Sequence, residues 1–324
     1  MASNTSDNRD HPLSTGTGRG HPERDRRRSA KRRVGHWDSE QGYARYRAEY
    51  DAAFAEFPEP ADTFSVGTDF GNVRVYRFEG EDREGHPLLL LPGKASGSPV
   101  WADNVPYLLE LGDVYVLDLL GEPGLSVQQR PITTDEEQAA WLHQTVQQLP
   151  PDAFHLVGLS FGGWNAVNLV LHNPAGIASI TLLDSSLTSR FPLEFYLRSI
   201  PATVPWLPKR WRDSFNSYLA GGFPAEDVPV ARMIEAGMHH FKIRLPQPSR
   251  FTEEQLATID LPALIIIGGN SPIHKPSAAA ELARSFPNGT VNVYVGASHA
   301  VNGEEPERIA HDITELIDAT ARRA

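Results

Sequence analysis

The chain contains, at residues 154–163, the stretch Phe154-His155-Leu156-Val157-Gly158-Leu159-Ser160-Phe161-Gly162-Gly163. Its first four residues have the pattern of a short buried strand, and the apolar residues after Ser160 predict a helix. Between them lies G-x-S-x-G, which is typical of a turn tight enough to project the serine hydroxyl above a sheet. Glycines two residues to either side are needed because side chains there would collide with the neighbouring strand and helix. We therefore interpret Ser160 as a nucleophile rather than as a simple turn residue.

The segments around this stretch alternate between strand and helix patterns, which favours an α/β fold with a doubly wound, mostly parallel sheet. The expected strands are Val73–Phe78, Leu88–Leu91, Val114–Leu117, Phe154–Val157, Ile177–Leu183, Leu264–Ile267 and Val291–Val295. The expected helices are Thr134–Gln148, Phe161–His172, Ser277–Phe286 and Glu305–Ala321.

Three further regions complete the expected organisation. Asp38 and Gln41 suggest a capping box, and the aromatic residues that follow at spacings of three and four predict an N-terminal helix docked on the core. Residues 185–258 are cut by prolines and rich in aromatic residues, so we expect a cap inserted over the carboxyl ends of the strands. Residues 1–36 have almost no large aliphatic residues and are expected to be a disordered basic tail. The domain is then 37–324.

The composition excludes several classes of function. The 324 residues include no cysteine, which rules out disulfides, thiolate metal sites and thiol nucleophiles. Residues 1–33 carry a net charge of +5, so the rest carries −16 of the total −11. This acidity argues against nucleic acid as a partner, although a polyanion-binding role for the basic tail stays open. No apolar run is long enough for a membrane span and no export signal is visible, so we expect a cytoplasmic protein.

A serine nucleophile needs a base and an oxyanion hole. His299 is the best candidate for the base because its loop follows the last strand and ends at the edge where Ser160 is expected. One oxyanion donor should be the backbone N–H of Phe161, directly after the nucleophile. The second should come from the loop after Leu88–Leu91, where we assign it to the N–H of Lys94. We assign no metal ligand and no cofactor.

These residues resemble the α/β-hydrolase superfamily over roughly residues 62–324. The segment from Asp118 to Ser126 is also similar to the superfamily's D-x-x-G-x-G-x-S pattern, whereas Pro92-Gly93 stands where His-Gly is usual. The resemblance implies an eight-stranded, mostly parallel sheet, a helical cap, a Ser-His-acid triad and no cofactor. Related dehalogenases and epoxide hydrolases carry aspartate at the turn, so Ser160 argues against both.

The acid of the triad is where the sequence departs from the superfamily. The usual acid position is occupied by Ser271, in Gly268-Gly269-Asn270-Ser271-Pro272-Ile273-His274. A serine can hydrogen-bond an imidazole but cannot stabilise an imidazolium by charge. Asp184, at the end of the strand after the nucleophile helix, is the preferred candidate. A Ser160–His299 pair without an acid, or another carboxylate, remain as alternatives.

The expected activity is hydrolysis of a carboxylic ester or related acyl bond of a small molecule, through a Ser160-His299-Asp184 triad and an acyl-enzyme. Two alternatives stay open. The departures at Ser271 and Pro92 would also suit a small-ligand receptor or pseudoenzyme on the same fold. A lyase or a perhydrolase could use the same site.

Overall fold

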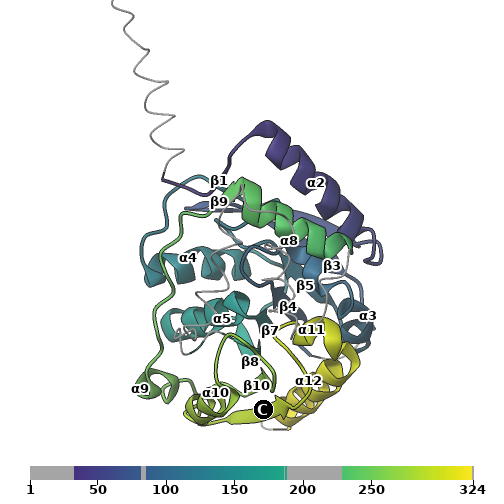
Figure 1. The fold of residues 1–324 in the computed structure, drawn as a ribbon. Coiled ribbons are helices and arrows are strands. Elements are labelled where there is room, and N and C mark those ends of the chain that lie inside the picture. Colours follow the sequence, from purple (N-terminus) through teal and green to yellow (C-terminus); the bar gives the residue numbers. More distant parts are fainter. Residues whose placement is uncertain (1–32, 82–84, 186, 188–227, 323–324) are drawn as a thin grey trace, which may run out of the picture.

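A computed structural model describes residues 33–81, 85–185, 187 and 228–322 of the chain (Figure 1). Its centre is a mixed sheet whose main path runs β11-β10-β8-β7-β4-β5-β3-β2, with the short strand β6 paired to β3 beside that path. The strands are β2 (Asp62–Thr68), β3 (Gly71–Phe78), β4 (Leu88–Leu91), β5 (Val114–Leu117), β6 (Val127–Gln128), β7 (Phe154–Leu159), β8 (Ile177–Leu183), β10 (Ala263–Gly268) and β11 (Gly289–Tyr294).

The strands from β5 to β11 along this path are parallel, whereas β2 and β3 add to the β5 side in antiparallel fashion. The expected α/β, doubly wound and mostly parallel sheet is therefore confirmed. Its eight main strands agree with the expected number, and β6 is an addition. Because parallel strands share one direction, the loops after β4, β7, β8, β10 and β11 all leave the same edge.

Side chains of the central strands alternate between two apolar layers. In β4, Leu89 and Leu91 join one buried cluster and Leu88 and Leu90 join the other. Helices α4 (Asp135–Val146), α5 (Phe161–His172) and α10 (Pro276–Ala283) cover the first face. Helices α3 (Val105–Leu108), α11 (Val301–Glu304) and α12 (Pro306–Ala321) cover the second. Burial on both faces explains why these strands read as continuous apolar runs.

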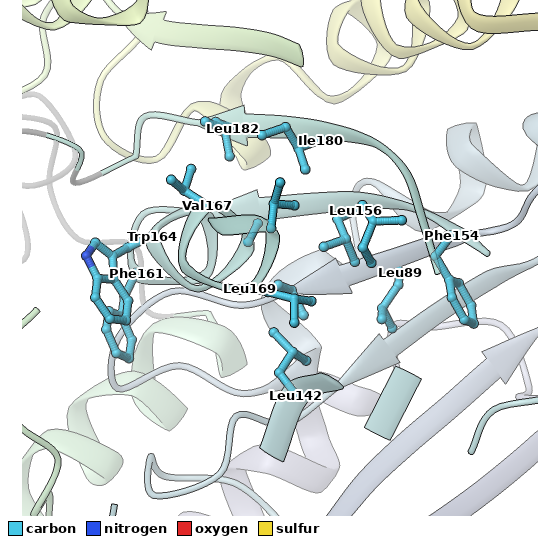
Figure 2. Packing of buried hydrophobic residues seen from close by; sticks show 14 of the residues in the cluster. Leu89, Leu142, Phe154, Leu156, Phe161, Trp164, Val167, Leu169, Ile180 and Leu182 are labelled. Atoms are coloured by element: carbon cyan, nitrogen blue, oxygen red, sulfur yellow. The ribbon is translucent and has the colours of Figure 1, made fainter. Parts of the chain in front are cut away.

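Helix α5 begins at Phe161, directly after Ser160, and packs into the core. Phe161 stacks on Trp164 at 5.5 Å between ring centroids, and both lie in the first apolar cluster with Val167 and Leu169 (Figure 2). The same cluster includes Leu156 of β7, so the strand and the helix on either side of the turn are anchored in one core. The turn between them is therefore held rigidly.

The N-terminal helix α2 (Glu40–Phe54) buries Tyr46 and Tyr50 as expected from its aromatic spacing. Its cap differs from the prediction, because Ser39 rather than Asp38 accepts the Gly42 N–H. Helix α8 (Pro229–His240) packs against α2, and strand β1 (His36–Trp37) pairs with β9 (Phe241–Lys242) (Figure 1). Residues before position 37 in the described chain are therefore already packed, since Val34 is buried. This differs from the tail boundary expected at residue 36.

The remaining differences are small. Strand β2 was not expected, and α10 ends at Ala283 rather than Phe286. The predicted helix Glu305–Ala321 is confirmed as α12, which begins at Pro306, and the short helix α11 before it was not expected. The short helices η1 (Ser98–Trp101), η2 (Leu109–Leu111) and α9 (Glu253–Leu256) complete the described elements. Residues 1–32 of the expected tail and most of the expected cap, 188–227, lie outside the described residues. In the described part of the chain, no helix is both long and apolar enough to cross a bilayer.

Candidate active site

Ser160 occupies a strained turn between β7 and α5. Its φ of +52° lies in the left-handed region that side chains rarely adopt, and its N–H donates to Leu183 O at 2.9 Å. A Cβ on Gly158 would lie 2.5 Å from the backbone of Gly162, and one on Gly162 would lie 2.1 Å from Leu91 O. Both glycines are therefore required by backbone contacts, as the G-x-S-x-G pattern predicts.

His299 lies in the loop that follows β11 and reaches the end of β8. Its Nδ1 lies 2.7 Å from Asp184 Oδ2, so the nitrogen that donates to the carboxylate is Nδ1 and Nε2 carries the free lone pair. The loop is fixed by Glu304, whose carboxylate accepts the Ser298 N–H at 2.6 Å and the Ser298 hydroxyl at 2.5 Å. Sequence reasoning did not identify this role of Glu304.

Asp184 is a fully buried carboxylate surrounded by donors. Besides His299, it accepts the Ser271 hydroxyl on Oδ2 at 2.5 Å and the Gly268 N–H on Oδ1 at 2.9 Å. His274 Nε2 also lies 2.9 Å from Oδ1, an ion-pair distance without the geometry of a hydrogen bond. Burial by itself raises the pKa of Asp184, but the two imidazoles outweigh it and hold that pKa well below its ordinary value. Asp184 is consequently ionised at neutral pH.

Ser271, at the usual acid position, faces Asp184 instead of replacing it. The loops after β8 and β10 thus meet at the Asp184 carboxylate. Ser271 donates a hydrogen bond to it, whereas a carboxylate at position 271 would repel it. His274, three residues further along the same loop, was noted in the sequence but given no role. The contact of His274 with Asp184 spans 90 residues of sequence, and no pattern in the sequence signals it.

The two residues expected to supply the oxyanion donors lie near each other and near the turn. Lys94 Nζ lies 5.9 Å from the centre of the Phe161 ring. A Cβ on Gly93, directly before Lys94, would lie 3.6 Å from Ser160 Cβ. Phe161 is the first residue of α5, where backbone N–H groups have no partner inside the helix. The loop after β4 and the start of α5 therefore flank the Ser160 side chain.

Backbone strain is concentrated at this edge of the sheet. Among the described residues, the non-glycine positions with left-handed φ are Ala95, Ser160 and Asp184, at +57°, +52° and +42°. They follow β4, β7 and β8, three adjacent strands. A strained backbone conformation persists only where the surrounding contacts hold it in place, and such positions cluster at active sites. The strain points to the same place as the side-chain chemistry.

The described residues also include one group with metal-ligand spacing, formed by His311, Asp312 and Glu315 on α12. Asp312 there already accepts hydrogen bonds from Asn292 and the Tyr294 hydroxyl. The group is otherwise exposed, so we assign it no function.

Comparison with known proteins identifies the family. A family model described as "Alpha/beta hydrolase family" matches residues 88–312. The chain belongs to the alpha/beta hydrolase family. It is 25% identical to the carboxylesterase nap of Bacillus subtilis over 85% of this chain and 93% of that protein. It is 24% identical to the carboxylesterase YbfK of the same organism over 83% of this chain and 92% of that protein.

Solved structures agree with this assignment of the hydrolase fold. The crystal structure of the B. subtilis carboxylesterase CesB (YbfK) has a TM-score of 0.77 at 22% identity, covering 85% of this chain and 98% of that one. That of the B. subtilis naproxen esterase has a TM-score of 0.78 at 23% identity, covering 86% and 99%. The expected superfamily is confirmed, and similarity to two named carboxylesterases along most of the chain makes this a carboxylesterase-like hydrolase.

Proposed function

We propose that this hydrolase cleaves carboxylic esters of small molecules with Ser160 as nucleophile, His299 as general base and Asp184 as the acid of the triad. The observation that carries the proposal is the 2.7 Å contact between His299 Nδ1 and Asp184 Oδ2 at the edge of the sheet where Ser160 stands on its strained turn. The names of the two similar B. subtilis carboxylesterases support the ester as the bond attacked.

The reaction begins when Ser160 Oγ attacks the ester carbonyl and His299 Nε2 takes the hydroxyl proton. The carbonyl oxygen becomes an oxyanion, which accepts hydrogen bonds from the N–H groups of Lys94 and Phe161. The tetrahedral intermediate collapses as His299 returns the proton to the departing alkoxide, which leaves as an alcohol. Water then attacks the acyl-enzyme by the same steps and releases the carboxylic acid and free Ser160.

Asp184 acts through the charge it places behind the imidazole. Because its pKa is lowered, its carboxylate is negative throughout the neutral range and stabilises the imidazolium formed when His299 takes the proton. The hydrogen bond at Nδ1 also fixes the tautomer, so that Nε2 is free to accept. Ser271 and Gly268 hold the carboxylate in this orientation.

Labelling by a fluorophosphonate together with hydrolysis of short p-nitrophenyl esters tests the proposal. The wild-type chain should be labelled and should turn over ester, and Ser160→Ala should lose both. Ser179→Ala is the matched control, because Ser179 is a buried serine on β8 that bonds to His155 rather than to the site. Ester binding without turnover by folded protein would refute the proposal and favour a receptor. Product analysis separates hydrolysis from lyase and perhydrolase chemistry.

A further inference from the structure

We propose that Glu122 is a positioning residue for the oxyanion hole, because its buried carboxylate fixes the backbone that presents the Lys94 N–H to Ser160. This inference rests on the proposed function. Glu122 lies in the loop between β5 and β6, in the segment that resembles the superfamily's glycine-containing pattern. It contributes no group to the triad or to the two N–H donors.

Two hydrogen bonds fix the peptide groups on either side of Lys94. Before it, the Gly93 carbonyl accepts the Ser96 hydroxyl at 2.8 Å. After it, the Ala95 N–H donates to Glu122 Oε2 at 2.9 Å. In a trans peptide the C=O and N–H point in opposite directions, so the bond to the Gly93 carbonyl also sets the direction of the Lys94 N–H. Because both flanking peptide groups are hydrogen-bonded, rotation of the backbone at Lys94 is restrained.

The turn formed by this segment would not hold its shape by local preference. Ala95 has a φ of +57°, which costs a residue with a side chain about 1–2 kcal/mol. The bond from its N–H to Glu122 offsets that cost. On the other side, a Cβ on Gly237 of α8 would lie 3.2 Å from Ala95 O and 3.0 Å from Pro123, so α8 closes over the same turn. Glu122 and α8 thus both contact this segment.

The burial of Glu122 indicates that its carboxylate is kept for a specific contact. The residue is 1% exposed, and among the described residues Oε1 has no hydrogen-bond partner. Burial raises the pKa of Glu122 to about 7, against the lowering effects of the Lys94 charge and the Ala95 N–H. An apolar side chain of similar size would avoid this cost of burial. The contact that an apolar residue could not make is the one to Ala95.

Three variants separate a positioning role from a structural one. Glu122→Gln keeps an acceptor for the Ala95 N–H, whereas Glu122→Leu fills similar volume without one. Ser96→Ala removes the hydroxyl that holds the other peptide. We expect Glu122→Leu to lower kcat for a p-nitrophenyl ester by about 30- to 100-fold with KM within about threefold, since losing one oxyanion donor costs about 10²–10³. Glu122→Gln should stay within about fivefold of wild type.

A trifluoromethyl ketone supplies the readout that a structural role would not move. It forms a hemiketal oxyanion on the serine, so its affinity depends on the same donors. Its Ki should rise in Glu122→Leu and Ser96→Ala by the factor by which kcat falls. A folded Glu122→Leu that keeps kcat within threefold overturns the inference, and so does a fall in kcat without loss of ketone affinity. If Glu122→Leu does not fold, Glu122→Asp, whose shorter side chain withdraws the acceptor, must show the same parallel loss.

The wild-type measurement keeps the two proposals apart. Absence of ester turnover by the folded wild-type chain refutes the proposed function, and the role of Glu122 falls with it. Turnover by the wild type that Glu122→Leu leaves unchanged refutes the role of Glu122 alone.

Discussion

Asp184→Asn is the substitution that most directly tests the candidate site. Asparagine has the shape of aspartate but only one acceptor oxygen. Its NH₂ group must therefore take the place of a carboxylate oxygen that accepts hydrogen bonds in the wild type. On the Oδ2 side the donors are the His299 Nδ1–H and the Ser271 hydroxyl. On the Oδ1 side the donor is the Gly268 N–H, and His274 Nε2 lies nearby without the geometry of a hydrogen bond. Neither orientation of the amide satisfies both sides.

The magnitude follows from these contacts. Hydrogen bonds to a charged group contribute about 1.5–3 kcal/mol each, and the amide loses at least the one from Gly268, so the free energy of unfolding should fall by about 1.5–3 kcal/mol or more. Loss of the charge and of the Nδ1–H tautomer should lower kcat by about 10³- to 10⁴-fold. Because the pKa of Asp184 is lowered, its stabilisation is present above the ordinary value of 3.8 and is lost as pH falls below it. The difference in stability between wild type and variant should therefore shrink in acid.

Asp118→Asn is the matched control for this experiment. Asp118 is also fully buried, and it accepts the Ser98 N–H and hydroxyl, the Leu125 N–H and the Tyr50 hydroxyl. Its substitution should destabilise the protein by a similar amount, measured by urea unfolding, while kcat for a p-nitrophenyl ester falls by less than about tenfold. If Asp118→Asn loses more turnover than Asp184→Asn, or if Asp184→Asn keeps kcat within tenfold, Asp184 is not the triad acid.

Three further substitutions test other parts of the argument. Gly162→Ala should abolish labelling by fluorophosphonate and soluble expression alike, because its Cβ would lie 2.1 Å from Leu91 O; a folded, labelled variant would contradict the turn geometry. Ser271→Asp should place a second carboxylate against Asp184 and lower the urea midpoint at pH 8 far more than at pH 4, where one of the two is protonated; equal losses at both pH values would argue against this contact. Glu122→Gln should change the pH profile of stability. Burial raises the pKa of Glu122 from 4.5 to about 7. The free energy of unfolding of the wild type should therefore fall by about 3 kcal/mol relative to this variant as pH rises through that range. Parallel stability–pH profiles of wild type and variant would contradict this.

Much of the sheet could be predicted because its central strands are buried on both faces. Leu88–Leu91 and Val114–Leu117 were predicted with their observed bounds, since each is a continuous apolar run. Strand β2 was missed because it lies at the edge of the sheet, where alternate residues are polar and the signal is weak. The start of α2 was misplaced by one residue because Asp38 and Ser39 are both good caps, and only the bond to Gly42 distinguishes them.

The sequence predicts the candidate site residues that a local motif or a strand end marks. It does not predict residues whose role depends on contacts with distant parts of the chain. Ser160 is marked by its own turn, and the structure now places Asp184 against His299, the neighbour that its position at a strand end suggested. The contacts of His274 and Glu122 have no such signature. Each is a single polar residue in a loop, and its role depends on which distant backbone or carboxylate the fold brings within 3 Å. The cap expected over the site falls mostly outside the described residues.

The pairing of the N-terminal segment with α8 has a consequence for synthesis of the chain. Asp38 N–H bonds to His240 O, and the two residues are 202 positions apart in sequence. On the ribosome, α2 emerges long before its partner exists, with Trp37, Tyr46 and Tyr50 left without the surface that buries them. Contacts this distant close late and leave apolar surface open to aggregation in the meantime. We therefore expect the yield of folded protein to depend on chaperones and temperature during translation.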